Sequence, residues 1–340
     1  MKIALESNNK TGFFTERWKN IAEEMGHEVV LVDFKDNDII SKLVACDACF
    51  WHFSHAEHPD YYLGKVITNT LSNSSCKSFP TFQDSWHFDD KIAQKYLLES
   101  INAPVPRSFV FYSFKEVNSF LKDADFPMVA KLKGGASSTN VKLLNNKTSA
   151  FWYSFISFYL GHRSINRFSA LRFSYGKLLA SKTSILNFSK DLAKIFVRSP
   201  FEKYNGSQKG YILLQEFLPN NDFDQRVVVI GNRAFALIRY ANENDFRASG
   251  TGNIEYDRTK IDMRCIEIAF EISSKLGTTC LAFDFLYGET QNPLIAEVSY
   301  GFHQDAYDDC QGYWKRDLTW IDKKVEPQRW MIEEVLSNDM

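Results

Sequence analysis

The 340-residue sequence lacks the long apolar segments that membranes require. It has no run of ~18 uninterrupted apolar residues that could span a bilayer, and its first residues, MKIALESNN, contain no apolar stretch of a secretory signal. A charge excess of one sign is also missing, because 40 Lys and Arg residues nearly balance 42 Asp and Glu residues. These absences predict a soluble cytoplasmic protein and exclude one built as a whole to coat nucleic acid.

Cysteine is sparse, with six residues at positions 46, 49, 76, 265, 280 and 310. Spread over a chain of this length, they predict reduced thiols rather than a disulfide framework. Only Cys46 and Cys49 lie close together, and the histidines at 52, 55 and 58 follow them, which is the pattern of an alternative zinc site. We favour a buried strand that runs into a loop, because the surrounding segment 43–55 is apolar and aromatic.

Hydrophobic residues (44%) and charged residues (24%) occur at globular frequencies, and the length predicts two or three domains. Residues 2–6, 13–25 and 28–34 read as strand, helix and strand, which is a βαβ opening. Ligands of such parallel sheets bind at the carboxyl ends of strands, where the loop 6–12 lies. A helix over 60–70 extends this domain.

The next segment combines a helix over about 89–99, the extended link NAPVP, and a predicted hairpin in PMVAKLKGGASSTNVKLL. Period-two alternation places Lys131 and Lys133 on one face of its first strand. The GGASS tip has the composition of a phosphate-binding loop, since glycine lets backbone amides approach an anion and serine adds donors. The alternative is an ordinary hairpin tip, because the segment has neither a Walker GK[ST] triplet nor a GxGxxG pattern.

The stretch 151–200 holds eight basic residues and a single acidic one, Asp191. Phe151, Phe155, Phe158 and Tyr159 recur at helical spacing, which favours a helical lobe with a solvated basic face. The alternative is a landing surface for an anionic substrate or for the cytoplasmic leaflet.

Two further hairpins follow in the sequence. In the first, Gly231-Asn232 is a turn signal, and counting outward places Asp224 opposite Arg239 with Arg226 on the same face. A helix over about 260–276 follows and closes at Gly277.

In the last hairpin, a turn centred between Thr290 and Gln291 pairs Asp284 with Glu297. Two carboxylates ~5 Å apart on one sheet face repel each other unless a cation lies between them. Ser299 lies on the same face and adds a third oxygen, so the pattern predicts a magnesium site. The alternative is an exposed hairpin, or a bulge that shifts the register. These alternatives are weakened because both acids interrupt apolar runs whose residues are expected to be buried, and a carboxylate is rarely buried without a partner.

In their order along the chain, these segments resemble the ATP-grasp superfamily, the fold of glutathione synthetase, D-alanine ligase and biotin carboxylase. The resemblance rests on DDKIAQKYLLESINAPVP, FPMVAKLKGGASS, LLQEFLPNNDFDQRVVV and AFDFLYGETQNPLIAEVSYGF, and it covers nearly the whole chain. It implies a mixed α/β and α+β fold: an amino-terminal Rossmann-like pre-ATP-grasp domain (1–88), then a two-lobed ATP-grasp domain. The first lobe (89–205) would carry the phosphate loop and the basic insertion. The second (206–340) would carry the adenine hinge and the metal hairpin.

The resemblance implies a nucleotide site for ATP. Lys91 and Lys131 would meet the α- and β-phosphates, and the hinge backbone would bind adenine, with Asp222 or Asp224 near the ribose. The implied nucleotide-binding residues are Lys91, Lys131, Lys133, Gly134, Gly135, Ala136, Ser137, Ser138, Gln215, Glu216, Phe217, Leu218, Asp222 and Asp224.

The resemblance also implies the ion and the chemistry. Asp284, Glu297 and Ser299 occupy the positions of ligands for Mg²⁺, with Mn²⁺ as an alternative ion. The family usually has asparagine where this chain has Ser299, so we expect weaker or altered coordination. Arg239 and Arg247 lie where the family places cations near the transferred phosphoryl group. From the residues alone, the alternative for Arg226 and Arg239 is a structural ion pair with Asp224.

The resemblance implies a ligase that activates a carboxylate as an acylphosphate and joins it to an amine. Candidate carboxylates are an amino acid, a peptide and a sugar acid, and we expect Ser7, Asn8 and the segment 52–58 to line the substrate site. The basic insertion favours a phosphate-bearing or nucleotide-linked acceptor, and we expect no nucleic-acid partner. The rivals are an ATP-grasp kinase that phosphorylates a hydroxyl and a non-catalytic nucleotide sensor.

Overall fold

The computed structural model describes residues 1–7, 13–55, 57–134, 140–163, 206–241 and 253–337. The chain divides into two compact units, each built from discontinuous segments. Unit 1 comprises Met1–Ser54, Pro59–Pro106 and Leu218–Met340, and unit 2 comprises His55–His58 and Arg107–Phe217. The division into continuous domains over 1–88, 89–205 and 206–340 stays a prediction.

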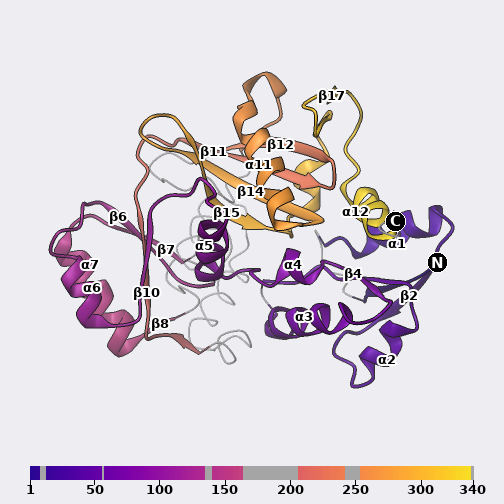
Figure 1. The fold of residues 1–340 in the computed structure, drawn as a ribbon, viewed down its shortest axis with the longest axis horizontal. Coiled ribbons are helices and arrows are strands. Elements are labelled where there is room, and N and C mark those ends of the chain that lie inside the picture. Colours follow the sequence, from indigo (N-terminus) through magenta and orange to yellow (C-terminus); the bar gives the residue numbers. More distant parts are fainter. Residues whose placement is uncertain (8–12, 56, 135–139, 164–205, 242–252, 338–340) are drawn as a thin grey trace, which may run out of the picture. The chain divides into compact units, whose positions relative to one another are not determined.

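Unit 1 begins with a four-stranded parallel sheet (Figure 1). Its strands are β1 (Lys2–Glu6), β2 (Glu28–Val32), β3 (Ala48–Phe50) and β4 (Lys77–Phe79), in the order β2-β1-β3-β4. The connecting helices are α1 (Thr15–Glu24), α2 (Ile39–Val44) and α3 (His58–Leu71). The predicted βαβ opening is therefore confirmed, because alternating βα segments place strands side by side in parallel.

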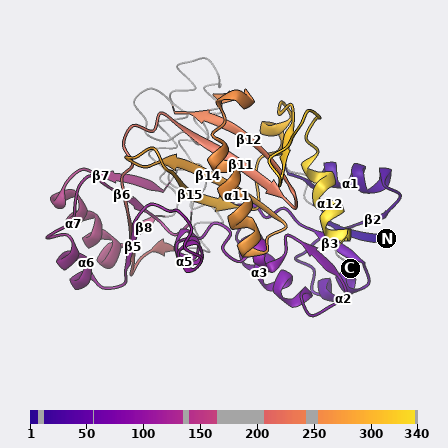
Figure 2. The ribbon, with the colours of Figure 1, turned by 45° about the horizontal axis from the view of Figure 1, so that its top comes forward.

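A larger antiparallel sheet forms the rest of unit 1, in the order β15-β14-β11-β12-β16-β17, with β13 paired to β12. Its strands are β11 (Phe223–Ile230), β12 (Arg233–Tyr240), β13 (Ile254–Glu255), β14 (Cys280–Tyr287), β15 (Pro293–Ser299), β16 (Tyr313–Lys315) and β17 (Trp320–Ile321). Helix α11 (Met263–Leu276) covers one face of it (Figure 2) and buries Cys265, Ile266 and Ala269 against the strands. It ends at Gly277, whose φ of +63° suits the predicted glycine cap.

The opposite face of this antiparallel sheet shares one apolar core with the parallel sheet. Tyr300 joins the two, because its buried hydroxyl accepts a hydrogen bond from the Phe53 backbone N–H (2.7 Å). Helix α12 (Pro327–Ser337) packs beside α1 at the same core (Figure 1). The short helices α4 (Phe82–Ser85), η2 (Arg258–Lys260) and η3 (Gln304–Tyr307) and the longer α5 (Lys91–Ser100) complete unit 1.

Asp84 ties α4 to the antiparallel sheet of unit 1. Its fully buried carboxylate accepts hydrogen bonds from the backbone N–H of Thr81 (2.8 Å) and of Thr279 (2.7 Å). Removing it leaves buried donors without an acceptor, so we expect Asp84→Ala to lower the free energy of unfolding by about 3 kcal/mol. Urea denaturation measures the loss, and Glu23→Ala, at an exposed position of α1, is the control that should leave stability unchanged. Equal stability of the two variants would contradict the stabilising role of the Asp84 carboxylate.

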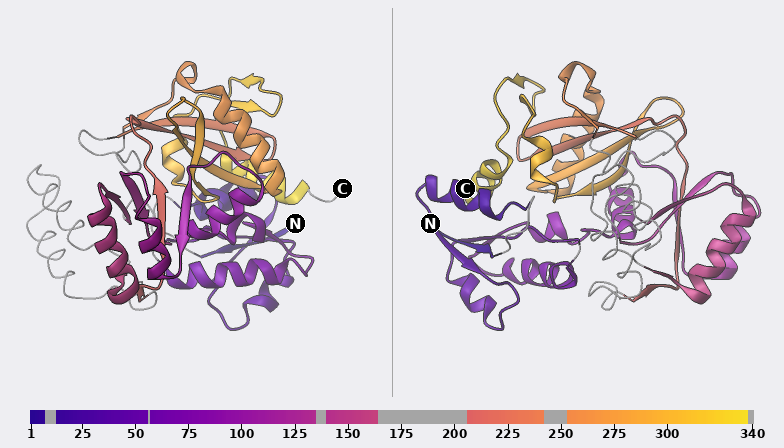
Figure 3. Two further views of the ribbon diagram at one scale, coloured as in Figure 1. Left: turned by 60° about the vertical axis from the view of Figure 1, so that its left-hand side comes forward. Right: turned by 180° about the vertical axis from the view of Figure 1, so that it is seen from behind.

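Unit 2 is a second antiparallel sheet, in the order β5-β10-β6-β7, with helices packed on it (Figure 3). Its strands are β5 (Ser108–Phe111), β6 (Met128–Lys131), β7 (Val141–Leu144) and β10 (Ile212–Glu216), and β8 (His162–Arg163) pairs with β9 (Ser207–Gln208). Its helices are α6 (Phe114–Phe120), α7 (Lys147–Phe155) and the π-helical turn η1 (Ile156–Leu160). The expected fold class, a Rossmann-like α/β sheet followed by α+β antiparallel sheets, is confirmed.

Candidate functional site

The hairpin β14–β15 brings the two predicted acidic residues opposite each other. Asp284 pairs with Glu297, and Ser299 pairs with Ala282 one step along the same face. The predicted pairing is correct although the predicted turn centre is wrong. The pairs next to the turn, such as Phe285 with Ile295, are symmetric about residue 290, and the register then shifts between Asp284 and Phe285. This bulge returns the acids to the predicted register.

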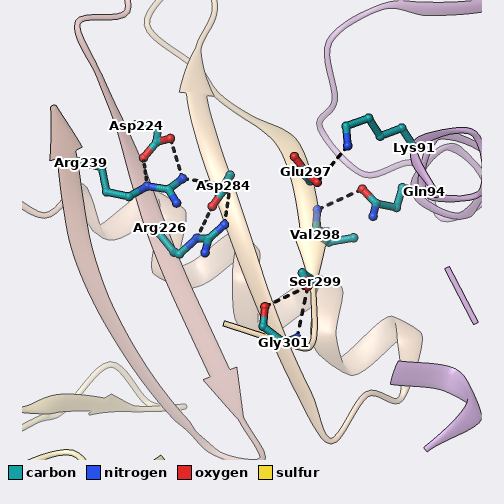
Figure 4. Close-up of polar contacts among 10 residues, drawn as sticks. All are labelled: Lys91, Gln94, Asp224, Arg226, Arg239, Asp284, Glu297, Val298, Ser299 and Gly301. Carbon is teal, nitrogen blue, oxygen red and sulfur yellow. Dashed lines mark hydrogen bonds and ion pairs between the residues drawn. The ribbon is translucent and has the colours of Figure 1, made fainter. Parts of the chain in front are cut away.

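Asp284 lies in a buried network of two carboxylates and two guanidinium groups (Figure 4). Arg226, its neighbour on β11, donates from Nε to Oδ1 (2.5 Å) and from Nη2 to Oδ2 (2.7 Å). Arg239 binds Asp224 through two hydrogen bonds of 2.6 Å, and its Nη2 lies 2.9 Å from Oδ2 of Asp284. The predicted opposition of Asp224 and Arg239 is confirmed, and the partner of Arg226 is Asp284 rather than Asp224.

The network holds Asp284 as a carboxylate. Burial raises its pKa, but the charges of Arg226 and Arg239 outweigh burial and hold the pKa well below its usual range. Two positive and two negative groups balance, so the network is neutral and can stay buried. A guanidinium has five N–H donors, so Arg239, which contacts two carboxylates, retains donors that could bind an anion.

Lys91 contacts Glu297, the second acidic residue of the hairpin. It is the first residue of α5, whose amino end Asp90 caps by accepting from Ala93 N–H (3.0 Å), and its Nζ lies 3.4 Å from Oε1 of Glu297. Sequence reasoning missed Gln94, one turn further along α5. Its Oε1 accepts from the Val298 backbone N–H (3.3 Å) and so ties the helix to β15 beside Glu297 (Figure 4). The sequence signal for Gln94 was its position three residues after Lys91, because residues at that spacing lie on the same face of a helix.

Three residues of the hairpin have side-chain oxygens, the ligand type that a hard cation binds. Asp284, Glu297 and Ser299 offer only oxygen, as Mg²⁺ prefers. In the described state the Asp284 oxygens accept from arginines, and the Ser299 hydroxyl donates to the Gly301 carbonyl (3.0 Å), so a cation would replace some of these contacts. Among the described residues, no group of three or more His, Cys, Asp or Glu is arranged to hold a metal, so neither the zinc alternative nor an all-acidic site has support there.

In unit 2, the predicted phosphate residues lie at the turn end of the β6–β7 hairpin. Lys131 ends β6 and pairs with Val141, and the Lys133 backbone N–H donates to the Tyr211 hydroxyl (2.7 Å). The Gly134 carbonyl accepts from the Asn140 side chain (2.8 Å). The other predicted tip residues, Gly135, Ala136, Ser137 and Ser138, lie outside the described residues.

The predicted adenine hinge lies at the end of β10. Gln215 is held by Ser108 (Nε2 to Oγ, 2.9 Å), and the Glu216 carboxylate accepts from the backbone N–H and Nε of Arg107 (both 2.8 Å). The boundary between the compact units falls between Phe217 and Leu218. Because the side chains of Gln215 and Glu216 already have partners in unit 2, recognition in this segment would depend on backbone groups.

The remaining predicted residues differ in their surroundings. Asp222 is exposed just before β11, whereas the carboxylate of Asp224 is committed to Arg239. Of the two ribose candidates, Asp222 is therefore the accessible one. Arg247 and Asn8 lie outside the described residues.

Glu6 ends β1 at the predicted substrate edge of the parallel sheet, next to Ser7. It is buried, accepts from the Phe34 backbone N–H (2.9 Å), and burial raises its pKa to about 7. Nearby, His52 stacks on Phe14 with ring centroids 3.9 Å apart. The edge expected to line the substrate site thus contains a carboxyl group that titrates near neutral pH.

The raised pKa of Glu6 makes stability depend on pH. Its contribution is fully present below the unfolded value of 4.5 and is lost as the pH rises through about 7. We therefore expect Glu6→Gln to match the parent at pH 4.5 and to exceed its free energy of unfolding by up to about 3 kcal/mol above pH 7. Urea denaturation of both proteins across this range measures the difference, and a difference that does not change with pH would contradict the prediction.

Comparisons with known proteins agree with this architecture. Residues 198–307 match the model of the RimK-like ATP-grasp domain. A curated relative, the α-aminoadipate–LysW ligase LysX of Saccharolobus solfataricus, is 19% identical over 83% of this chain and 88% of its own.

Two solved structures have similar folds. The first is the N5-carboxyaminoimidazole ribonucleotide synthetase of Thermotoga maritima, with a TM-score of 0.60 and 14% identity; the match covers 98% of this chain and 75% of that one. The second is the biotin carboxylase domain of Hydrogenobacter thermophilus 2-oxoglutarate carboxylase, solved with MgADP, ADP and bicarbonate. Its TM-score is 0.60 at 9% identity, and the match covers 99% of this chain and 70% of that one. Residues 198–307 are therefore similar to the RimK-like ATP-grasp domain, and the fold of the chain is similar to those of the two solved structures.

Proposed function

We propose that this chain is an ATP- and Mg²⁺-dependent carboxylate–amine ligase that works through an acylphosphate and releases ADP and phosphate. The LysX relative is a ligase, the Thermotoga neighbour is a synthetase, and the Hydrogenobacter neighbour was solved with MgADP. These similarities support ligase chemistry and a magnesium-bound nucleotide.

One observation carries the proposal: the cationic and acidic groups of unit 1 meet on neighbouring strands of one sheet and at the first residue of α5 beside it. Arg226 and Arg239 meet at Asp284, and Asp284 pairs with Glu297, which contacts Lys91. Transfer of a phosphoryl group spreads negative charge over its equatorial oxygens, and cations that are already positioned stabilise that charge without reorganising. The group holds three cations and three acids, counting Asp224, and most of them are buried. Burying this many charges carries a desolvation cost that an apolar core serving stability alone would avoid.

We assign to the residues the roles that the resemblance to the ATP-grasp superfamily implies. Arg239 and Arg247 stabilise the transferred phosphoryl group, and Lys91 and Lys131 bind the α- and β-phosphates. Lys133 and the tip 134–138 cover the γ-phosphate, the backbone of 215–218 binds adenine, and Asp222 binds the ribose. Asp284, Glu297 and Ser299 would hold Mg²⁺, which when bound neutralises the β- and γ-phosphate oxygens.

The proposed reaction has two balanced steps. A carboxylate oxygen of the substrate attacks the γ-phosphorus, and the bond to the bridging oxygen breaks as ADP leaves. The amine nitrogen then attacks the acyl carbon, inorganic phosphate leaves with the shared oxygen, and the amine gives up a proton. Candidate carboxylates are amino acids, peptides and sugar acids, and the net basic sequence 151–200 favours a phosphate-bearing or nucleotide-linked acceptor.

We further propose a reducing, cytoplasmic setting. All six cysteines are free and buried. Reduced thiols are the usual state in the cytoplasm, where disulfides rarely persist. Separately, no helix in the described part of the chain is long and apolar enough to cross a bilayer.

The test is a screen of carboxylates and amines scored by ADP formation, with mass detection of the product. In parallel, hydroxylamine replaces the amine, because it traps an acylphosphate as a hydroxamate. A ligase gives an amide and a hydroxamate, both dependent on Mg²⁺. A stable phosphate ester without hydroxamate would identify a kinase instead, and nucleotide binding without turnover on any pair would favour a sensor.

A further inference from the structure

Strand β15 lies at the edge of the antiparallel sheet of unit 1. It begins the strand order β15-β14-β11-β12-β16-β17, so among the described strands it has a neighbour on one side only. Two of its N–H groups find acceptors outside the sheet: Ile295 donates to the Pro104 carbonyl (2.7 Å), and Val298 donates to Oε1 of Gln94 (3.3 Å). Helix α5 and the link after it therefore cover backbone groups that an edge strand leaves open.

Gln94 uses both ends of its side-chain amide in this contact. While Oε1 accepts from Val298, Nε2 donates to the carbonyl of His87 (3.4 Å), in the turn before α5. Gln94 is buried, and Leu98, one turn further along α5, packs in the apolar core. Apolar contact is non-directional, whereas a hydrogen bond has a preferred distance and angle. The amide of Gln94 therefore fixes where α5 lies along β15.

The contact between Lys91 and Glu297 connects the same two elements. Lys91 lies one turn before Gln94 on α5, and Glu297 directly precedes Val298 on β15 (Figure 4). The Lys91 ammonium lies 3.4 Å from Oε1 of Glu297. A lysine side chain is flexible and its ammonium is a point charge, so this ion pair does not by itself hold the helix in one position. The spacing of the pair depends on the neighbouring contact of Gln94.

We propose that Gln94 is a positioning residue for Lys91 and Glu297: by holding α5 against β15, it fixes the distance between the cation and the acid. The catalytic part of this inference rests on the proposed function, in which Lys91 binds a phosphate and Glu297 holds Mg²⁺. Both groups then act on one bound nucleotide, and a displacement of about 1 Å can lower a rate about a hundredfold.

The test compares Gln94→Met with Leu98→Ala. Methionine is similar in size to glutamine but makes neither hydrogen bond. Leu98→Ala removes buried apolar contact from the same helix, so it lowers stability while keeping the contacts of Gln94. It is therefore the control for a loss of stability alone.

The first measurement needs no substrate. Acetic anhydride acetylates lysines that it can reach, and mass spectrometry compares the rate at Lys91, which is buried, with the rate at Lys275, an exposed residue of α11. We expect Lys91 to react at least about threefold faster in Gln94→Met than in the parent, because α5 separates from β15 more often. In Leu98→Ala the rate should stay within about twofold of the parent.

The second measurement is ADP formation with the substrate pair found in the screen. Gln94→Met should lower kcat at least about tenfold while KM for ATP changes by no more than about threefold, because the nucleotide keeps its other contacts. Leu98→Ala should leave both constants within about twofold of the parent. A residue that served stability alone would not give this difference between the variants.

Three results would overturn the role of Gln94. They are an unchanged acetylation rate of Lys91 in Gln94→Met, an equal increase in both variants, and an unchanged kcat in Gln94→Met. MgATP distinguishes these from a failure of the proposed function, since it should slow acetylation of Lys91 in the parent. A lack of protection would contradict the nucleotide role of Lys91, while the comparison of the two variants would still decide the role of Gln94.

Discussion

Glu297→Gln is expected to lower kcat for ADP formation by at least about a hundredfold while leaving the fold intact. Glutamine keeps the shape of Glu297 but loses the charge that would hold a cation and that faces Lys91 at 3.4 Å. The side chain is only half-buried, so the neutral variant adds no unpaired buried charge beyond Lys91 itself. Steady-state ADP release with the substrate pair found in the screen measures the effect.

The same hairpin provides the control for that variant. Glu289 lies at the exposed turn between β14 and β15, so Glu289→Gln makes the same chemical change away from the site. It should keep parental kcat. Raising the Mg²⁺ concentration should partly restore Glu297→Gln if the lost group is a cation ligand. Full turnover of Glu297→Gln would end the metal assignment.

Asp284→Ala is expected to lower the free energy of unfolding by about 3–5 kcal/mol and to abolish turnover. Arg226 loses its two hydrogen bonds to Asp284, and Arg239 keeps only Asp224, so the buried network carries a net positive charge. Urea denaturation gives the stability change. Asp222→Ala, at an exposed position before β11, should change stability by no more than about 0.5 kcal/mol.

A double variant separates the structural role of this pair from its chemical role. Arg226→Met/Asp284→Leu removes the ion pair as a whole and leaves Arg239 and Asp224 balanced, so it should recover most of the stability lost in Asp284→Ala. It should not recover ADP formation, because apolar side chains cannot hold a cation or a phosphate. A double variant that is stable and active would show that the network serves the fold alone.

The two hairpins of the antiparallel sheet show how far local rules reach. Gly231-Asn232 predicted the pairing of Asp224 with Arg239 correctly, because a two-residue turn leaves only one register. In the last hairpin the pairing of Asp284 with Glu297 was also predicted correctly, but through a turn placed half a residue away and without the bulge. Bulges arise from twist and packing of the finished sheet, which a residue count does not contain.

Several short strands were not predicted. β4 has three residues and β17 has two, and such runs are too short for an alternating pattern to stand out. They exist because a neighbouring strand offers unpaired backbone groups, which is a property of the assembled sheet. Longer elements such as β1 and α11 were predicted to within a few residues, because each carries its own periodicity and end signals.

Alternation and turn residues were enough to place the acids of the last hairpin and the arginines of β11 and β12, since these depend on neighbours along the chain. The fold class was predicted from the resemblance to the ATP-grasp superfamily. The partners of those groups needed the folded chain. Arg226 reaches Asp284 across 58 positions, and Lys91 reaches Glu297 across 206. Which carboxylate neutralises which cation depends on strand order and helix docking, because the Coulomb energy of a buried pair depends on distance in space rather than on separation in sequence.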